Sequence, residues 1–312
     1  MTYLGESAAL ATSVSWTLCG LGFAFASRRV GALAVNQIRI LAAVVVLLAV
    51  HTVTYGAPWP AGLGSRQIGV LAISGVIGLG LGDLCYFHSM AVLGPRVGAL
   101  LMGTSPVLCA LMAWPALDEP LDAQSALGIG VVVCGVGIVL ADPRGERGWA
   151  PAGTPQRRRA AIGAGLLAAL CQAGGLILAK IGMSGGSTLG PPLEPLSATV
   201  VRMLAGAVAV AILAAARRHL RSTVQAGRDG RAMLATAVGV AFGPTLGVWL
   251  SMVSVKNAPA GVAATLMSLQ PIMILPIARV AYGARPGPLA IVGAIFAVAG
   301  TAILFWPRGL SS

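Results

Sequence analysis

Charged residues are scarce in this chain: only 10% of its 312 residues are Asp, Glu, Lys or Arg, and only 9 of these are acidic. Hydrophobic residues make up 57% of the sequence, and the mean hydropathy is +0.87. A chain with so little charge would be insoluble if most of it faced water, which excludes an ordinary soluble protein. We therefore expect a multi-pass protein of the cell membrane, surrounded by the lipid bilayer and without a sizeable soluble domain.

Motifs that carry enzymatic or metal chemistry are also missing. The 5 cysteines form no C-x-x-C pair, and neither H-E-x-x-H nor the phosphate-binding motif G-x-x-x-x-G-K-[ST] occurs. The net charge of +12 does not indicate nucleic-acid binding, because the basic residues are concentrated in loops without interleaved aromatic residues. We expect no catalytic residue, no metal site, no cofactor and no ATP coupling.

Apolar segments of about 20 residues, the length that crosses a bilayer as a helix, follow one another along the chain. Only short interruptions separate them. We place these segments near residues 7–27, 33–52, 67–91, 95–117, 123–141, 160–181, 196–216, 232–255, 260–282 and 287–306. The predicted fold is an all-α polytopic membrane protein with ten transmembrane helices.

The second half of the chain repeats the first at an offset of 165 residues, the separation of Pro106 and Pro271. Other residues that match at this offset include Gly78 and Gly243, Gly82 and Gly247, Ser89 and Ser254, and Gly135 and Gly300. Because each copy holds an odd number of segments, the second enters the membrane from the opposite face, as inverted repeats of transporters do. We divide the chain into a first five-helix repeat (1–141), a basic linker (142–159) and a second five-helix repeat (160–312).

The loops differ strongly in positive charge. If they alternate between the two sides of the membrane, fifteen of the 21 Lys and Arg residues fall on one side and four on the other. Arg39 and Arg202 remain inside the predicted segments. By the positive-inside rule the richer side is cytoplasmic, which places both termini outside.

Several motifs occur in an order that is typical of one family. They are Trp16, Asn36 and Arg39, Gly82, Asp83 and Tyr86, Ser105, Pro106 and Val107, and Glu119 in the first half, and Arg202, Gln270, Pro271, Gly293 and Gly300 in the second. In order and duplication they resemble the EamA family of the drug/metabolite transporter superfamily. The resemblance implies a ten-helix carrier of small metabolites, amino-acid-like compounds or drugs, often an exporter, that works by alternating access. Members of that family usually have both termini in the cytoplasm, opposite to the charge count.

Asp83 is the first candidate for a functional residue, because it is the only acid well inside a predicted segment. A carboxylate there is costly unless it faces a partner, the bundle interior or water. Tyr86 shares its helical face, and Arg39 is its natural partner by depth in the membrane. Two roles stay open for Asp83: a proton-sensitive element of transport, or one half of a structural salt bridge.

Arg202 takes the place of Arg39 in the second copy, but it has no acid to match, because Val248 stands where the first copy has Asp83. Arg202 is expected either to bind an anionic group of the substrate or to extend to the membrane interface. The other candidates for substrate binding are polar or aromatic residues inside segments, although such residues more often contact a neighbouring helix. They are Trp16, Asn36, Gln172, Trp249 and Gln270.

Pro106 and Pro271 are candidate hinges, since proline removes a backbone donor and bends its helix. A different class of protein is suggested by Gly80-Leu81-Gly82-Asp83, which matches the G-x-G-D motif of intramembrane aspartyl proteases. That chemistry requires two carboxylates sharing a proton, and no second acid occurs within a predicted segment. A non-transporting membrane scaffold is the remaining alternative.

Overall fold

The computed structural model of the protein describes residues 3–93, 98, 101–140, 154–186, 189–216, 226–270, 272–273 and 287–305. Within these ranges the regular elements are helices, and extended backbone pairs only in an isolated bridge between Gly186 and Gly190. Helical segments long and apolar enough to cross a membrane are Ala34–Tyr55, Ser65–Tyr86, Pro155–Ser184, Pro195–Leu213 and Gly230–Asn257. Together with shorter apolar helices, they make this a multi-pass integral membrane protein.

The two halves contain corresponding helices. The first half has α1 (Leu4–Val30), α2 (Ala32–Tyr55), α3 (Ser65–Gly75), η1 (Val76–Gly82), α4 (Asp83–Leu93), α6 (Ser105–Leu117) and α7 (Ala123–Leu140). The second half has α8 (Pro155–Ser184), α9 (Pro195–Ala216), α11 (Gly230–Val240), η3 (Ala241–Gly247), α12 (Val248–Asn257), α13 (Ala260–Met267) and α15 (Pro288–Phe305). The bounds of α3, η1 and α7 recur in α11, η3 and α15 at the sequence offset, so the duplication extends to the backbone.

A π-helix of 7 residues interrupts the third helical pass of each half. η1 has the sequence VIGLGLG and η3 the sequence AFGPTLG, so both are rich in glycine. In η3, Pro244 has no N–H to donate, which interrupts the α-helical hydrogen bonding. The sequence predicts uninterrupted helices at 67–91 and 232–255. The wider turns are therefore a finding of the structure, and such turns are frequent at functional sites.

The fourth pass of the first half is also not one continuous helix. A turn at Gly103 and Thr104 precedes α6, and Pro106 is the second residue of that helix. At this position the missing N–H costs no helical hydrogen bond, so Pro106 begins a helix rather than bending one. A turn at the matching positions, Ser268 and Leu269, follows α13 in the second half. Its symmetry mate Pro271 lies outside the described residues.

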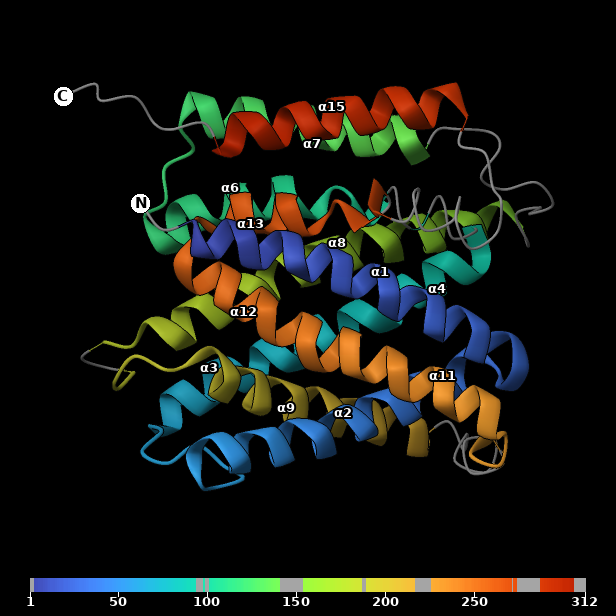
Figure 1. The fold of residues 1–312 in the computed structure, drawn as a ribbon, viewed down its shortest axis with the longest axis vertical. Helices are drawn as coiled ribbons and strands as arrows, with labels where there is room; N and C mark the ends of the chain where they lie inside the picture. Colours follow the sequence, from blue (N-terminus) through green and yellow to red (C-terminus); the bar gives the residue numbers. More distant parts are fainter. Residues whose placement is uncertain are drawn as a thin grey trace.

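The two halves interlock (Figure 1). The third pass of the first half, α3 to α4, packs against α8, and its α3 and η1 also contact α9. In the same way α11 and η3 pack against α1 and α2, and α12 packs against α1. Each half therefore places its third pass against the first two helices of the other half. α1 begins and α15 ends at the same end of the bundle.

The helices α7 and α15 form a layer of their own at one edge of the molecule (Figure 1). A Cβ atom on Gly135 would lie 2.6 Å from the backbone nitrogen of Ala297, and one on Gly293 would lie 2.5 Å from the carbonyl oxygen of Gly135. Glycine at these positions lets the two backbones touch, as is common between membrane helices.

Candidate functional site

Arg39 and Asp83 form an ion pair directly after η1. Nη2 of Arg39 lies 2.6 Å from Oδ2 of Asp83, and the two side chains are 15% and 27% exposed. Nε of Arg39 donates to Oδ1 of Asn36 at 2.7 Å, one turn earlier on α2. The guanidinium also lies 5.4 Å from the centre of the Phe23 ring. The expected pairing is present, and each charge is compensated.

Arg202 is buried between α3, α9 and α12, with only 4% of its surface exposed. Its Nε donates to Oγ of Ser74 at 2.8 Å, and its Nη1 lies 2.8 Å from Sδ of Met252. Oγ of Ser74 in turn donates to the carbonyl oxygen of Gly175 at 2.5 Å. The side chain points into the bundle, so the expectation that it extends to the membrane interface is wrong. Among the described residues, no carboxylate forms an ion pair with Arg202.

The two arginines reach η1 from opposite ends. A Cβ atom on Gly75, just before η1, would lie 2.1 Å from the carbonyl oxygen of Arg202, and one on Gly78 would lie 3.5 Å from its Nη2. Arg39 binds Asp83, the first residue after η1. The irregular turn of the first half therefore lies between two cations: the partly buried Arg39, which is paired with an acid, and the buried Arg202, which is held by neutral groups.

A third cluster joins α1 to the second half. Nε2 of Gln270 donates to the carbonyl oxygen of Trp16 at 3.2 Å, and Oγ1 of Thr17 donates to that of Gln270 at 3.3 Å. The Trp16 ring covers Gly247, where a Cβ atom would lie 2.6 Å from the indole nitrogen. Trp16 and Gln270 thus lie together at the seam between the halves.

The remaining candidates are Tyr86, Gln172 and Trp249. Tyr86 and Gln172 are partly buried on α4 and α8. Trp249 lies on α12, and 37% of its surface is exposed. In the part of the chain that the structure describes, no group of His, Cys, Asp and Glu could hold a metal ion.

Reasoning from the sequence missed the partners that come from the other half. Ser74, which binds Arg202 from α3, is an example, because it stands in no motif. Glu119 was singled out, but its partners were not: its Oε1 lies 2.5 Å from Nζ of Lys180, and its Oε2 accepts from the backbone nitrogen of Ala260 at 2.7 Å. The carboxylate of Glu119 therefore caps the start of α13, where a helix favours negative charge.

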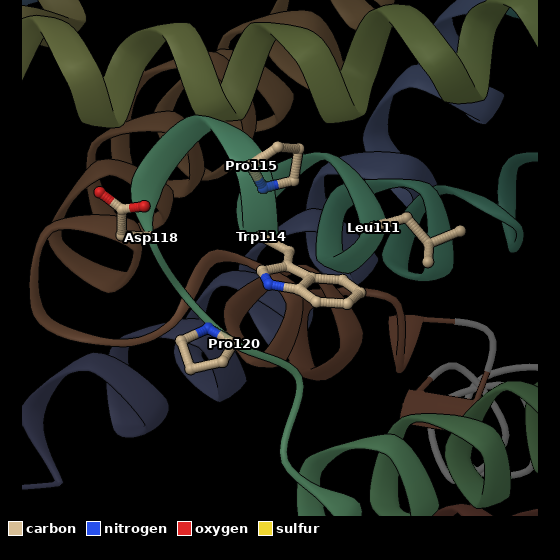
Figure 2. A pocket seen from close by; sticks show the side chains of 5 residues that line it. All are labelled: Leu111, Trp114, Pro115, Asp118 and Pro120. Carbon is tan, nitrogen blue, oxygen red and sulfur yellow. The ribbon is translucent and has the colours of Figure 1, made fainter.

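A surface hollow of about 550 Å³ lies along the end of α6. Figure 2 shows its lining, which consists of Leu111, Trp114, Pro115, Asp118 and Pro120. Leu111 and Trp114 are more than half exposed, and the hollow contains none of the candidate residues. An exposed tryptophan near a helix end is typical of the membrane interface, and we assign no substrate to this hollow.

Comparisons with known proteins agree with this architecture. The sequence model of the EamA-like transporter family matches residues 3–141 and again residues 159–306. A protein of known crystal structure is similar over 98% of this chain and 97% of its own, with a TM-score of 0.75 and 15% sequence identity. A search of curated protein sequences finds no match. At 15% identity the structural similarity shows the fold alone.

Proposed function

We propose that this chain, which belongs to the EamA-like transporter family, carries small metabolites, amino-acid-like compounds or drugs across the cell membrane by alternating access, with export as its net direction. The family match in both halves supports a transporter of the drug/metabolite type. No ATP-binding motif occurs in the sequence, so the energy comes from an ion gradient or from the gradient of the substrate itself.

The observation that carries this proposal is the reciprocal packing of the two halves. Each third pass, with its π-helix, lies against the first two helices of the other half. Along this seam the helix backbones approach each other closely. A Cβ atom on Gly175 of α8 would lie 3.1 Å from the Cα atom of Gly78 in η1. Close backbone contacts of this kind suit two halves that rock against each other about a central site, as in inverted-repeat carriers.

The polar groups along this seam supply the proposed substrate and proton sites. Trp16 and Gln270 join the halves directly, and Tyr86 lies on the same helix as Asp83. A proton taken up by Asp83 would remove the negative charge that balances Arg39, so loading and release of a proton would change the stability of this contact. We assign Asp83 the role of a proton-sensitive element of transport.

The protease alternative lacks support. Asp83 is bound to a guanidinium, and aspartyl proteases need a second carboxylate sharing a proton with the first. Among the described acids, Glu119 pairs with Lys180, Glu194 with Lys256 and Asp229 with Arg29.

The test compares Asp83→Asn with the wild type after reconstitution into liposomes, measuring substrate counterflow across a range of pH. The variant is expected to insert normally and to lose the pH dependence of transport. Asp118→Asn is the matched control, because it also removes a carboxylate, and Asn tolerates the positive φ of 51° at that exposed position. An Asp83→Asn variant with unchanged rate and pH profile would refute the proton role. Cleavage of peptides by the wild type but not by the variant would refute the carrier.

A further inference from the structure

We infer that Arg202 is an anion-binding residue of the carrier and that its ligand is a carboxylate group of the transported molecule. This inference rests on the proposed transport function and narrows its substrate class. It starts from the two equivalent arginines of the two halves, whose surroundings differ in charge and in the size of a neighbouring side chain.

The first difference is charge. Arg39 has Asp83 at 2.6 Å, whereas the equivalent of that acid in the second copy is Val248. Val248 is buried in an apolar cluster that also contains Val200 and Met203, which lie close to Arg202 on α9. The contacts that Arg202 makes instead, a hydroxyl and a thioether, carry no negative charge.

The second difference is space. In the first copy the Phe23 ring lies beside Arg39 and fills the gap to Gly239 and Gly243, where a Cβ atom would lie 2.5 Å and 3.6 Å from ring carbons. In the second copy, Gly175 is the residue packed against the matching positions Ser74 and Gly78. The first arginine thus lies beside an aromatic ring, and the second has a glycine at the position that matches this ring.

A buried guanidinium that has no counter-charge among the described residues needs an explanation. Arginine keeps its proton in proteins, so Arg202 cannot become neutral as a buried lysine can. A charge at 4% exposure is expensive unless an opposite charge balances it. The guanidinium also has more N–H donors than the contacts to Ser74 and Met252 use. An anionic group of the substrate would supply both the missing charge and the missing acceptors.

The chemistry of the site favours a carboxylate over a phosphate. A single guanidinium carries one positive charge, which one carboxylate balances, whereas a phosphate dianion would leave an uncompensated negative charge in the bundle. The planar fork of arginine matches the two oxygens of a carboxylate. Gly75, Gly78 and Gly175 bring the backbone close to Arg202, so a compact anionic group suits this site better than a bulky one.

The experiment measures how matched small probes shift the thermal stability of the purified protein, since a ligand of the folded state raises the apparent Tm. The probes are phenylacetate and indole-3-acetate, their neutral amides, and phenyl phosphate. Wild type is expected to be stabilised by the carboxylates more strongly than by the amides. Arg202→Gln should lose this preference.

A second variant keeps Arg202 and therefore avoids the risk that its removal prevents folding. Val248→Asp introduces a carboxylate one helical turn before Met252, on the same face of α12, where it copies the role of Asp83 in the other half. The new carboxylate should form an ion pair with Arg202 inside the bundle. It should therefore weaken carboxylate binding about tenfold or more while leaving amide binding unchanged. Val248→Asn, of the same size but without the charge, should keep the carboxylate preference.

The outcomes separate the two proposals. Equal stabilisation by carboxylates and amides, or a carboxylate preference that persists in both Val248→Asp and Arg202→Gln, overturns the role of Arg202. A stronger effect of phenyl phosphate overturns the carboxylate class. If the amides bind and cross liposome membranes through the protein while the carboxylates do neither, the carrier stands and this inference falls. If no probe of either kind binds or crosses, the proposed function falls with it.

Discussion

The side chains of Arg39 and Asp83 connect α2 to the start of α4, and each is at most 27% exposed. At such burial, removing one partner leaves the other charge without compensation, and this usually costs more than the pair itself contributes. The Phe23 ring and Asn36 hold the guanidinium in place, so Arg39 cannot easily turn toward water when the acid is lost. The pair therefore behaves as one electrostatic unit.

Coupling between these two residues is testable by a double-mutant cycle. Asp83→Asn alone is expected to destabilise the protein by about 3 kcal/mol, because the charge of Arg39 stays buried. Asp83→Asn combined with Arg39→Gln should recover more than half of this loss, because no charge remains. Thermal unfolding of the four proteins in the same detergent measures the effect. Strictly additive changes would show that the two side chains do not interact.

A different carboxylate, Asp229, lies at the basic end of the bundle and caps α11. The backbone N–H of Ala232 and the side chain of Arg29 hold the pKa of Asp229 below its ordinary value of 3.8. Because the folded state lowers this pKa, the stabilising contribution is present above pH 3.8 and is lost as the pH falls below it, through the lowered value of the folded state.

This pH dependence predicts the behaviour of Asp229→Asn, which keeps a capping oxygen but has no charge. The wild type should unfold at a higher temperature than the variant at neutral pH, and the difference should shrink as the pH falls below about 4. Unfolding curves of both proteins across this range provide the measurement. A difference that stays constant down to about pH 3 would mean that the charge of Asp229 does not contribute.

At the scale of the elements, the third helical pass of the first half packs closely through glycine residues. Its α3 and η1 touch α9 at Gly75 and α8 at Gly78, and both contacts involve backbone atoms. Such contacts bring the helix axes close together and place Arg202 against η1. The effect of replacing glycine by alanine should therefore depend on the position in this pass. At Gly69 of α3, unlike at Gly75, a Cβ atom would have no neighbouring atom within 4 Å.

The matched pair Gly75→Ala and Gly69→Ala tests the close approach. Gly75→Ala should cost about 3 kcal/mol, since its methyl group would overlap the carbonyl oxygen of Arg202 and force α3 away from α9. Gly69→Ala should instead stabilise the protein by about 0.5–1 kcal/mol through the higher helix propensity of alanine. Denaturation of both variants in one detergent decides the matter, and equal effects would refute the close packing at Gly75.

For the whole molecule, the two ends of the bundle differ in charge. Lys180 binds Glu119 and the carbonyl oxygen of Ala258 at the end that the sequence assigns to the outside, and Lys256 pairs there with Glu194. Most basic residues belong to the loops of the other end. α1 begins and α15 ends at the same end of the bundle, so the orientation of one terminus decides that of the other.

The charge distribution predicts that both termini lie outside the cytoplasm. A phosphatase that is active only outside, fused after Ser312, should therefore be active, whereas a reporter that fluoresces only in the cytoplasm should stay dark. Fusion of the same two reporters within the linker, after Gly153, should give the opposite result and serves as the control. A bright cytoplasmic reporter after Ser312 would reverse the orientation and agree with the arrangement usual in the family.

The sequence by itself determined the features that follow from local pattern. Apolar length placed α2 and α9 to within a few residues, the constant offset revealed the duplication, and the depth of Asp83 and Arg39 in adjacent segments was enough to pair them. These features follow from the apolar segments, from the position of a charged residue within its segment, or from a repeat that is visible in the sequence. The physical reason is that the bilayer requires each apolar segment to be a helix and sets its minimum length, independently of the neighbouring segments.

Only the tertiary structure decided how the halves contact each other. The neutral neighbours of Arg202, the capping of α13 by Glu119 and the cover of Gly247 by Trp16 all depend on contacts between distant segments of the chain. No local pattern encodes them, because they depend on which faces of the helices pack together and how closely glycine lets them approach. The wide turns η1 and η3 belong to the same class, since glycine permits several helical geometries and packing selects one of them.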